Sequence, residues 1–242
     1  RHTRCADVTG VQTCALPICR RRDTRQGVLL SAPGSFKDRF VDDDPDLLYL
    51  DGNSLGRLPK AAVDLAERLV AEEWGSRLIR GWNEGWMELT TRIGDKVGQV
   101  IGARPGEVRI ADSTSVNLYK LAMAATRARP DRRVVVTDDL NFPSDHHVLG
   151  SVAQAAGVEV RVVPSPDGIH GPVEGLLGAL DDDVALLTLS GTAFQSGYTY
   201  DVAALTTAAH DVGALTLWDF SHTVGSVPIA ATNDGVDLAV GC

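Results

Sequence analysis

Four short apolar runs of the sequence are each followed by polar side chains that are suited to chemistry. The runs end at Ala111, Thr137, Leu189 and Trp218. In an open parallel sheet, ligands bind beyond the carboxyl ends of the strands. The side chains that follow these runs are therefore the first candidates for a binding or catalytic site.

The first cluster, Asp112–Asn117, places hydroxyl groups at the start of an apolar helix. Thr114 and Ser115 would add side-chain donors to the backbone N–H groups and the positive end of the helix dipole, which together suit a phosphate. Ordinary N-capping by Ser113 or Ser115 explains the pattern equally well. The sequence contains neither G-x-G-x-x-G nor G-x-x-x-x-G-K-S/T, so dinucleotide and P-loop sites lose their main support.

The second cluster contains Phe142, Ser144 and Asp145. Phe142 can cover the face of a planar ligand, although a single Phe is more often part of a core. Ser144 and Asp145 can equally cap the next helix. His146 and His147 are adjacent and lack the i, i+4 spacing of a metal-binding pair on a helix, so we expect no metal site.

The third and fourth clusters supply Ser190 and then Asp219 with His222. A carboxylate at the end of an apolar strand is costly unless a positive or donating group meets it. Asp219 is therefore suited to holding a proton on a heteroaromatic nitrogen, with His222 near enough to orient it. A helix cap or a salt bridge within the loop is an equally good explanation for Asp219.

The elements that must position these residues alternate between β-branched runs and segments of helical period from Leu48 onward. This alternation is typical of an α/β fold with a mostly parallel sheet flanked by helices. The helices that precede Val108 lie outside the alternation, and we interpret them as an N-terminal arm. The expected strands are Val108–Ala111, Val134–Thr137, Val158–Val163, Val184–Leu189 and Leu215–Trp218. The expected helices are 59–74, 87–101, 115–128, 144–156, 173–180 and 202–212.

The first 18 residues are expected not to belong to the protein. Arg1–Arg4 and Val8–Ile18 read like a translated sequencing adapter, and such segments are excluded from fold reasoning. The rest of the chain is expected to divide into a poorly defined segment, the arm and a large domain, at 19–47, 48–107 and 108–242.

The charge composition limits which classes of molecule the protein is expected to bind. The chain has 23 basic and 32 acidic residues and a net charge of -9, which argues against nonspecific binding to nucleic acid or anionic lipid. No apolar run reaches the ~18 residues of a membrane span, and no secretory signal is recognisable, so we expect a cytoplasmic protein. Cys5, Cys14 and Cys19 lie near one end and Cys242 at the other, which does not suit a disulfide framework.

From Leu48 to Cys242 the sequence resembles the kynureninases, pyridoxal-phosphate enzymes of the aspartate-aminotransferase fold type. The G-N-S-L-G string at 52–56 and the F-P-S-D string at 142–145 are specific in this order and spacing, whereas D-x-x-H at 219–222 alone indicates only the broader fold type. Further matching strings lie at 79–83, 112–117, 190–191 and 236–242.

The resemblance implies a role for each matching residue. Thr114 and Ser115 correspond to the phosphate-binding groups, and Phe142 to the residue stacked on the pyridine ring. Asp219 corresponds to the carboxylate that pairs with the pyridinium nitrogen, and His222 to its partner histidine. The remaining implied contacts are Pro143, Ser144, Asp145 and Ser190 for the cofactor and Asn53, Ser54 and Trp82 for the substrate, with packing of the arm as an alternative for the last three.

The resemblance also implies a homodimer that hydrolyses L-kynurenine, or 3-hydroxykynurenine, to anthranilate, or 3-hydroxyanthranilate, and L-alanine in tryptophan catabolism. In the family, a Schiff-base lysine follows the string that matches 240–242. The lysines of this chain, at 37, 60, 96 and 120, do not match it. We therefore expect the N-terminal part of such an enzyme, without the small C-terminal domain and inactive alone.

Two alternatives remain open from the sequence. One is another enzyme of the same cofactor class, such as a relative of cysteine desulfurases. The other is a non-catalytic α/β binding domain, in which Asp219 would face solvent or a cationic side chain.

Overall fold

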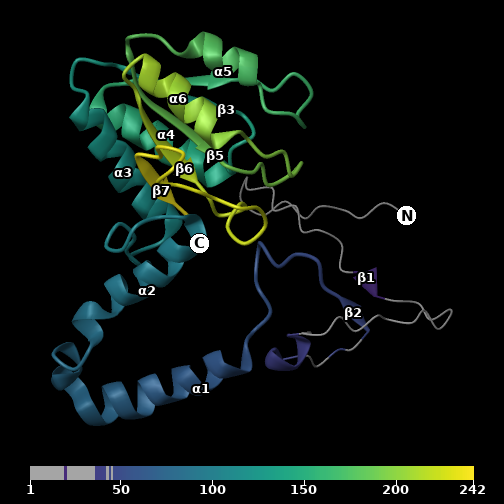
Figure 1. Cartoon of the computed structure of the whole chain (residues 1–242), viewed down its shortest axis with the longest axis vertical. Helices are drawn as coiled ribbons and strands as arrows, with labels where there is room; N and C mark the ends of the chain where they lie inside the picture. Colours follow the sequence, from purple (N-terminus) through teal and green to yellow (C-terminus); the bar gives the residue numbers. More distant parts are fainter. Residues whose placement is uncertain (1–18, 21–35, 42–43, 45) are drawn as a thin grey trace. The chain divides into compact units, whose positions relative to one another are not determined.

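The computed structural model describes residues 19–20, 36–41, 44 and 46–242 (Figure 1). The adapter-like strings lie outside these described residues. The chain divides into two compact units, residues 1–82 and 83–242. Among the described helices, none is both long and apolar enough to cross a bilayer.

The first unit carries the start of the expected arm. The helix α1 (Lys60–Arg68) begins directly after Pro59, continues as the π-helical η2 (Leu69–Arg77) and ends in the 3-10 helix η3 (Leu78–Trp82). The same unit contains the short pair β1 (Cys19–Arg20) and β2 (Leu47–Leu48), which is antiparallel, and the 3-10 helix η1 (Lys37–Arg39).

The second unit is built on a five-stranded sheet in which every pairing is parallel. The strand order is β4-β3-β5-β6-β7. This arrangement confirms the α/β class that the alternation predicts. The strands are β3 (Val134–Asp138), β4 (Glu159–Val163), β5 (Val184–Ser190), β6 (Leu215–Asp219) and β7 (Leu238–Val240).

Helices cover both faces of the sheet, so β3 and β5 are buried along their whole length (Figure 1). The helices are α3 (Thr114–Ala128) and α4 (Pro143–Ala156) on one face and α5 (Val173–Ala179) and α6 (Val202–Asp211) on the other. The first face packs through Leu118, Ala122, Leu149, Val152, Val135 and Leu186. The second packs through Leu176, Leu205, Ala209, Val136, Leu187 and Trp218.

The expected strand Val108–Ala111 is wrong, because this run packs on a helix. The helix α2 (Trp86–Ile101) ends at Gly102, and the chain then turns back along it. The N–H of Ile110 donates to the carbonyl of Thr90 at 3.3 Å, and a Cβ on Gly94 would overlap the Val108 carbonyl. The run therefore satisfies its backbone and apolar groups against α2. The fifth strand is instead β7, which the sequence patterning did not predict.

The strand order reverses between β3 and β5. Along the chain, β4 is added on one side of β3 and β5 on the other. The connection after β3 leads to α4 on one face, and that after β5 leads to α6 on the opposite face. Connections that diverge in this way leave space at the carboxyl edge, where ligands bind in open α/β sheets.

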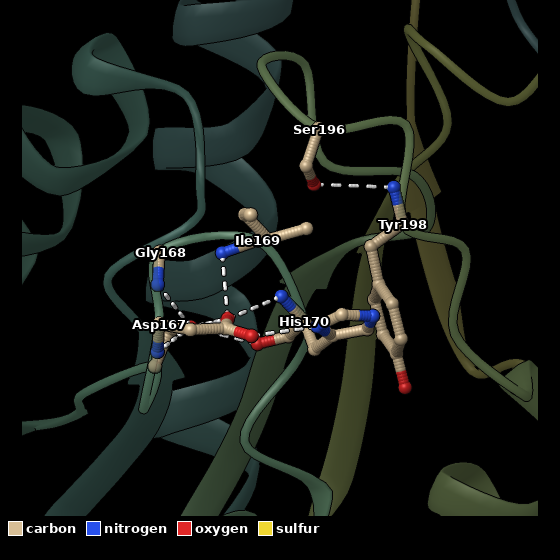
Figure 2. Close-up of polar contacts among 7 residues, drawn as sticks. Asp167, Gly168, Ile169, His170, Ser196 and Tyr198 are labelled. Carbon is tan, nitrogen blue, oxygen red and sulfur yellow. Dashed lines mark hydrogen bonds and ion pairs between the residues drawn. The ribbon is translucent and has the colours of Figure 1, made fainter.

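A compact turn at residues 165–171 braces the segment that follows β5 (Figure 2). The carboxylate of Asp167 accepts the N–H groups of Ile169 and His170, each at 2.8 Å, and lies 2.7 Å from Nδ1 of the His170 ring. These bonds hold the pKa of Asp167 below its usual value. The His170 ring meets Tyr198 edge to face, with centroids 5.9 Å apart.

Gly171 extends this contact to the end of β3. A Cβ at Gly171 would overlap the rings of Tyr198 and Tyr200. Tyr200 is buried, and its hydroxyl donates to the carboxylate of Asp138. The turn, the segment after β5 and the end of β3 are thus packed as one block.

We expect Gly171→Ala to lower the free energy of unfolding by about 1–3 kcal/mol, since the added methyl group has no room beside two packed rings. Gly178→Ala is the matched control, because a Cβ there meets no atom within 4 Å and the helix gains a better former. Urea unfolding followed by far-UV circular dichroism measures both. Equal stability of the two variants would contradict the close packing at Gly171.

Candidate functional site

Three of the four predicted clusters lie at the carboxyl ends of neighbouring strands. Phe142–Asp145 follows β3, Ser190 ends β5 and Asp219 ends β6. Ser190 and Asp219 are partners in the β5–β6 register. The sheet therefore brings these residues to one edge, as the sequence predicts.

The remaining cluster, Asp112–Asn117, reaches the same edge because of the direction of α3. Beyond the end of this helix, the Nε of Arg129 donates to the carbonyl of Gly213 at 3.0 Å, just before β6 begins. The last turn of α3 thus lies at the amino edge of the sheet. The 15 residues of α3 span about 22 Å at ~1.5 Å each, more than the ~17 Å of a five-residue strand. Its first turn, with Thr114 and Ser115, is therefore at the carboxyl edge.

Ser113 caps the N-terminus of α3, which agrees with the N-capping that the sequence offered as one explanation of this cluster. Its Oγ accepts the N–H of Val116 at 3.4 Å. Thr114 and Ser115 lie in the first helical turn, where hydroxyl groups remain suited to an anion. Their role as phosphate ligands stays a prediction.

Three aromatic rings meet at this edge. The centroids of Phe142 and His222 are 5.8 Å apart with planes inclined by 31°. Phe194, from the segment after β5, lies 5.0 Å from Phe142 in an edge-to-face arrangement and 6.1 Å from His222. Phe142 is 39% exposed, so part of its ring is open to a planar ligand. Sequence reasoning missed Phe194, which no motif marks.

Asp145 does not cap α4, contrary to one of the two readings of the sequence. Phe142 is the N-cap residue, and the Asp145 side chain is buried in the first turn. Burial and, next, the negative charge of Asp219 raise the pKa of Asp145 to about 7. Asp145 also lies within hydrogen-bonding reach of the Asp219 carboxylate. The fold thus brings together two acidic groups that the sequence separates by more than seventy residues, and it favours the protonated form of Asp145.

Asp219 is fixed by the turn that follows it. Its Oδ1 accepts the backbone N–H of Ser221 at 2.8 Å and the Ser221 hydroxyl at 2.6 Å. Only 4% of Asp219 is exposed. The carboxylate therefore has a set orientation at the end of β6.

Two buried polar atoms at this edge have no hydrogen-bond partner among the described residues. They are the Oγ of Ser190 and the Nδ1 of His222. Buried polar atoms in folded proteins are nearly always paired. Unpaired groups beside a partly open ring and a buried acid pair are the features expected of a polar, planar ligand's binding site.

The predicted substrate residues lie in the first unit. Asn53 and Ser54 are exposed, and the Ser54 N–H donates to the Asp51 carbonyl at 3.2 Å within a turn. Trp82 is also exposed. Their roles stay predictions.

The family model for class-V aminotransferases matches residues 48–241. The chain belongs to the class-V aminotransferase family. This class-V chain is 43% identical over 203 residues to a kynureninase of Pseudomonas fluorescens. It is 41% identical over the same length to a kynureninase of Burkholderia pseudomallei. Each match covers 81% of this chain and 47% of the relative, so the chain spans about half the length of these curated relatives.

Solved structures share the fold of this chain. A variant of the lyase C-DES, described with glycine covalently linked to its PLP cofactor, has a TM-score of 0.67 and 16% sequence identity. The likeness covers 80% of this chain and 51% of that one. At this identity it shows the fold alone.

We expect Asp145 to contribute stability that falls as the pH rises from about 4 to about 7. Between these values the folded chain keeps a proton on Asp145 that the unfolded chain has released, which contributes up to about 1.4 kcal/mol per pH unit. Asp145→Asn should remove this contribution. Urea unfolding across the range measures it, with exposed Asp182→Asn as control. The same pH slope in Asp145→Asn as in the unaltered chain would contradict the raised pKa of Asp145.

Proposed function

We propose that the chain forms the pyridoxal-phosphate-binding part of a kynureninase, an enzyme that hydrolyses L-kynurenine to anthranilate and L-alanine. The main support for this proposal is that the F-P-S-D stretch contacts the residues after β6 at one edge of the sheet. Asp145 of this stretch lies beside Asp219, and Phe142 lies beside His222. The identity of 43% to a curated kynureninase supports the choice of reaction.

The residues at this edge fit the cofactor. The partly exposed face of Phe142 suits the pyridine ring, and the Asp145–Asp219 pair suits the protonated ring nitrogen. The unpaired Ser190 Oγ and His222 Nδ1 would bond to polar substituents of the ring. The first turn of α3, with Thr114 and Ser115, would hold the phosphate.

When bound, pyridoxal phosphate supplies an electron sink that stabilises negative charge developing on an amino-acid substrate. The task of the chain is to keep the ring nitrogen protonated and the ring in place. Ser221 holds Oδ1 of Asp219, which leaves the rest of that carboxylate for the ring nitrogen. Because burial and the charge of Asp219 raise the pKa of Asp145, the two groups together carry less negative charge than two ionised carboxylates would, which suits the single positive charge of a pyridinium.

The finer parts of the proposal concern the whole protein. We propose that it acts as a hydrolase on a carbon–carbon bond, as a homodimer in the cytoplasm, with Asn53, Ser54 and Trp82 at the substrate. Release of the fluorescent product anthranilate from L-kynurenine tests the reaction. Alanine formation from cysteine without anthranilate release would favour the cysteine-desulfurase alternative.

Cofactor binding is tested on the chain itself with pyridoxine 5′-phosphate, which lacks the aldehyde and so does not react with surface lysines. We expect saturable binding in equilibrium dialysis, weakened about tenfold or more in Asp219→Ala, because the protonated nitrogen loses its charged partner. Asp182→Ala, at the opposite edge of the sheet, is the control and should bind as the unaltered chain does. Absence of saturable binding, or equal binding by Asp219→Ala, would refute the proposed site.

A further inference from the structure

Asn141 is a buried polar residue between the strands that flank the proposed cofactor site. It directly precedes Phe142, and only 4% of it is exposed. None of the sequence motifs singles it out. Its place is the point between β3 and β5 where the strand order reverses.

The two strands separate before they reach the site. The β3–β5 register ends at the pair Val136 and Leu187. In contrast, β3 stays paired with β4 to its last residue, and β5 stays paired with β6 as far as Ser190 and Asp219. The last three residues of β5 therefore have no partner in β3.

The side chain of Asn141 bridges this gap. Its Nδ2 donates to Thr137 Oγ1 at 2.7 Å and to the Thr188 carbonyl at 3.5 Å, and its Oδ1 accepts the N–H of Ser190. The amide thus bonds to both strands and replaces the missing part of the ladder. In doing so it ties the backbone of Ser190 to the residue next to Phe142.

The turn that carries Asn141 is held in place by the side chain of Asp138. The Oδ1 of Asp138 accepts the N–H groups of Leu140 at 3.1 Å and Asn141 at 3.0 Å. The hydroxyl of Tyr200 donates to the other oxygen of Asp138. Asn141 therefore has its backbone fixed on β3 while its side chain reaches β5.

We propose that Asn141 is a positioning residue that sets the separation between Phe142 and Ser190, and thereby the fit of the ring in the proposed cofactor site. This inference rests on the proposed function. Asn141 acts through its neighbours and is not itself a cofactor contact. Without its amide, the unpaired ends of β3 and β5 are free to spread, and the buried N–H of Ser190 loses its acceptor.

The first test measures binding of pyridoxine 5′-phosphate by Asn141→Ala and by the isosteric Asn141→Asp. We expect Asn141→Ala to bind about tenfold more weakly or worse. Asn141→Asp should bind weakly at pH 8 and recover, relative to the unaltered chain, at pH 5.5. The protonated acid can donate to Thr188 and accept from Ser190 as the amide does, whereas the carboxylate cannot donate.

The control separates positioning from general destabilisation. Thr206→Val removes one buried side-chain hydrogen bond, from Trp218 Nε1 at 3.1 Å, on the second face of the sheet. We expect this variant to lose stability without losing probe affinity. Equal affinity losses in Thr206→Val and Asn141→Ala at equal stability would overturn the inference.

A second readout needs no cofactor. Amide hydrogen exchange at Ser190 should be faster in Asn141→Ala, which removes the acceptor of the Ser190 N–H, if the amide holds the end of β5. If the unaltered chain fails to bind the probe, the proposed function falls, and the inference with it. If Asp219→Ala weakens binding but the Asn141 variants bind within about twofold of the unaltered chain, only the inference falls.

Discussion

When two carboxyl groups are buried side by side, burial and their mutual repulsion disfavour ionisation of both. Asp145 and Asp219 are in this position at the carboxyl edge of the sheet, and burial and the charge of Asp219 raise the pKa of Asp145. The surrounding structure keeps the pair in place, since α4 delivers one acid and β6 the other. A ligand with a protonated ring nitrogen relieves the constraint, which makes the acid pair the centre of the proposed site.

The fold alone does not determine which reaction the protein catalyses. Members of one fold family carry different chemistries, so the function must be argued from the site. The C-DES structure shares the architecture at 16% identity. The curated kynureninases share 41% to 43% of their aligned residues with this chain. The residues that decide the proposal are therefore those of the F-P-S-D stretch and their partners at the edge of the sheet.

Much of the fold and part of the site could be predicted from the sequence. Patterning located β3, β5 and β6 because they are buried and β-branched, and the residues at their ends followed from the geometry of parallel sheets. It failed for Val108–Ala111, since an apolar run packs equally well on a helix. It also missed Phe194 and Asn141, whose importance depends on contacts across the sheet that no local spacing encodes.

The strand order has a consequence for folding during synthesis on the ribosome. Each strand of the sheet pairs with one made earlier: β4 and β5 with β3, β6 with β5, and β7 with β6. The sheet can therefore grow outward as the chain emerges, without waiting for a later segment. Asp219 and His222 are the last of the proposed ligands to be synthesised. A nascent chain that stalls before β6 would therefore lack Asp219 and His222, the proposed partners of the ring nitrogen and its substituents.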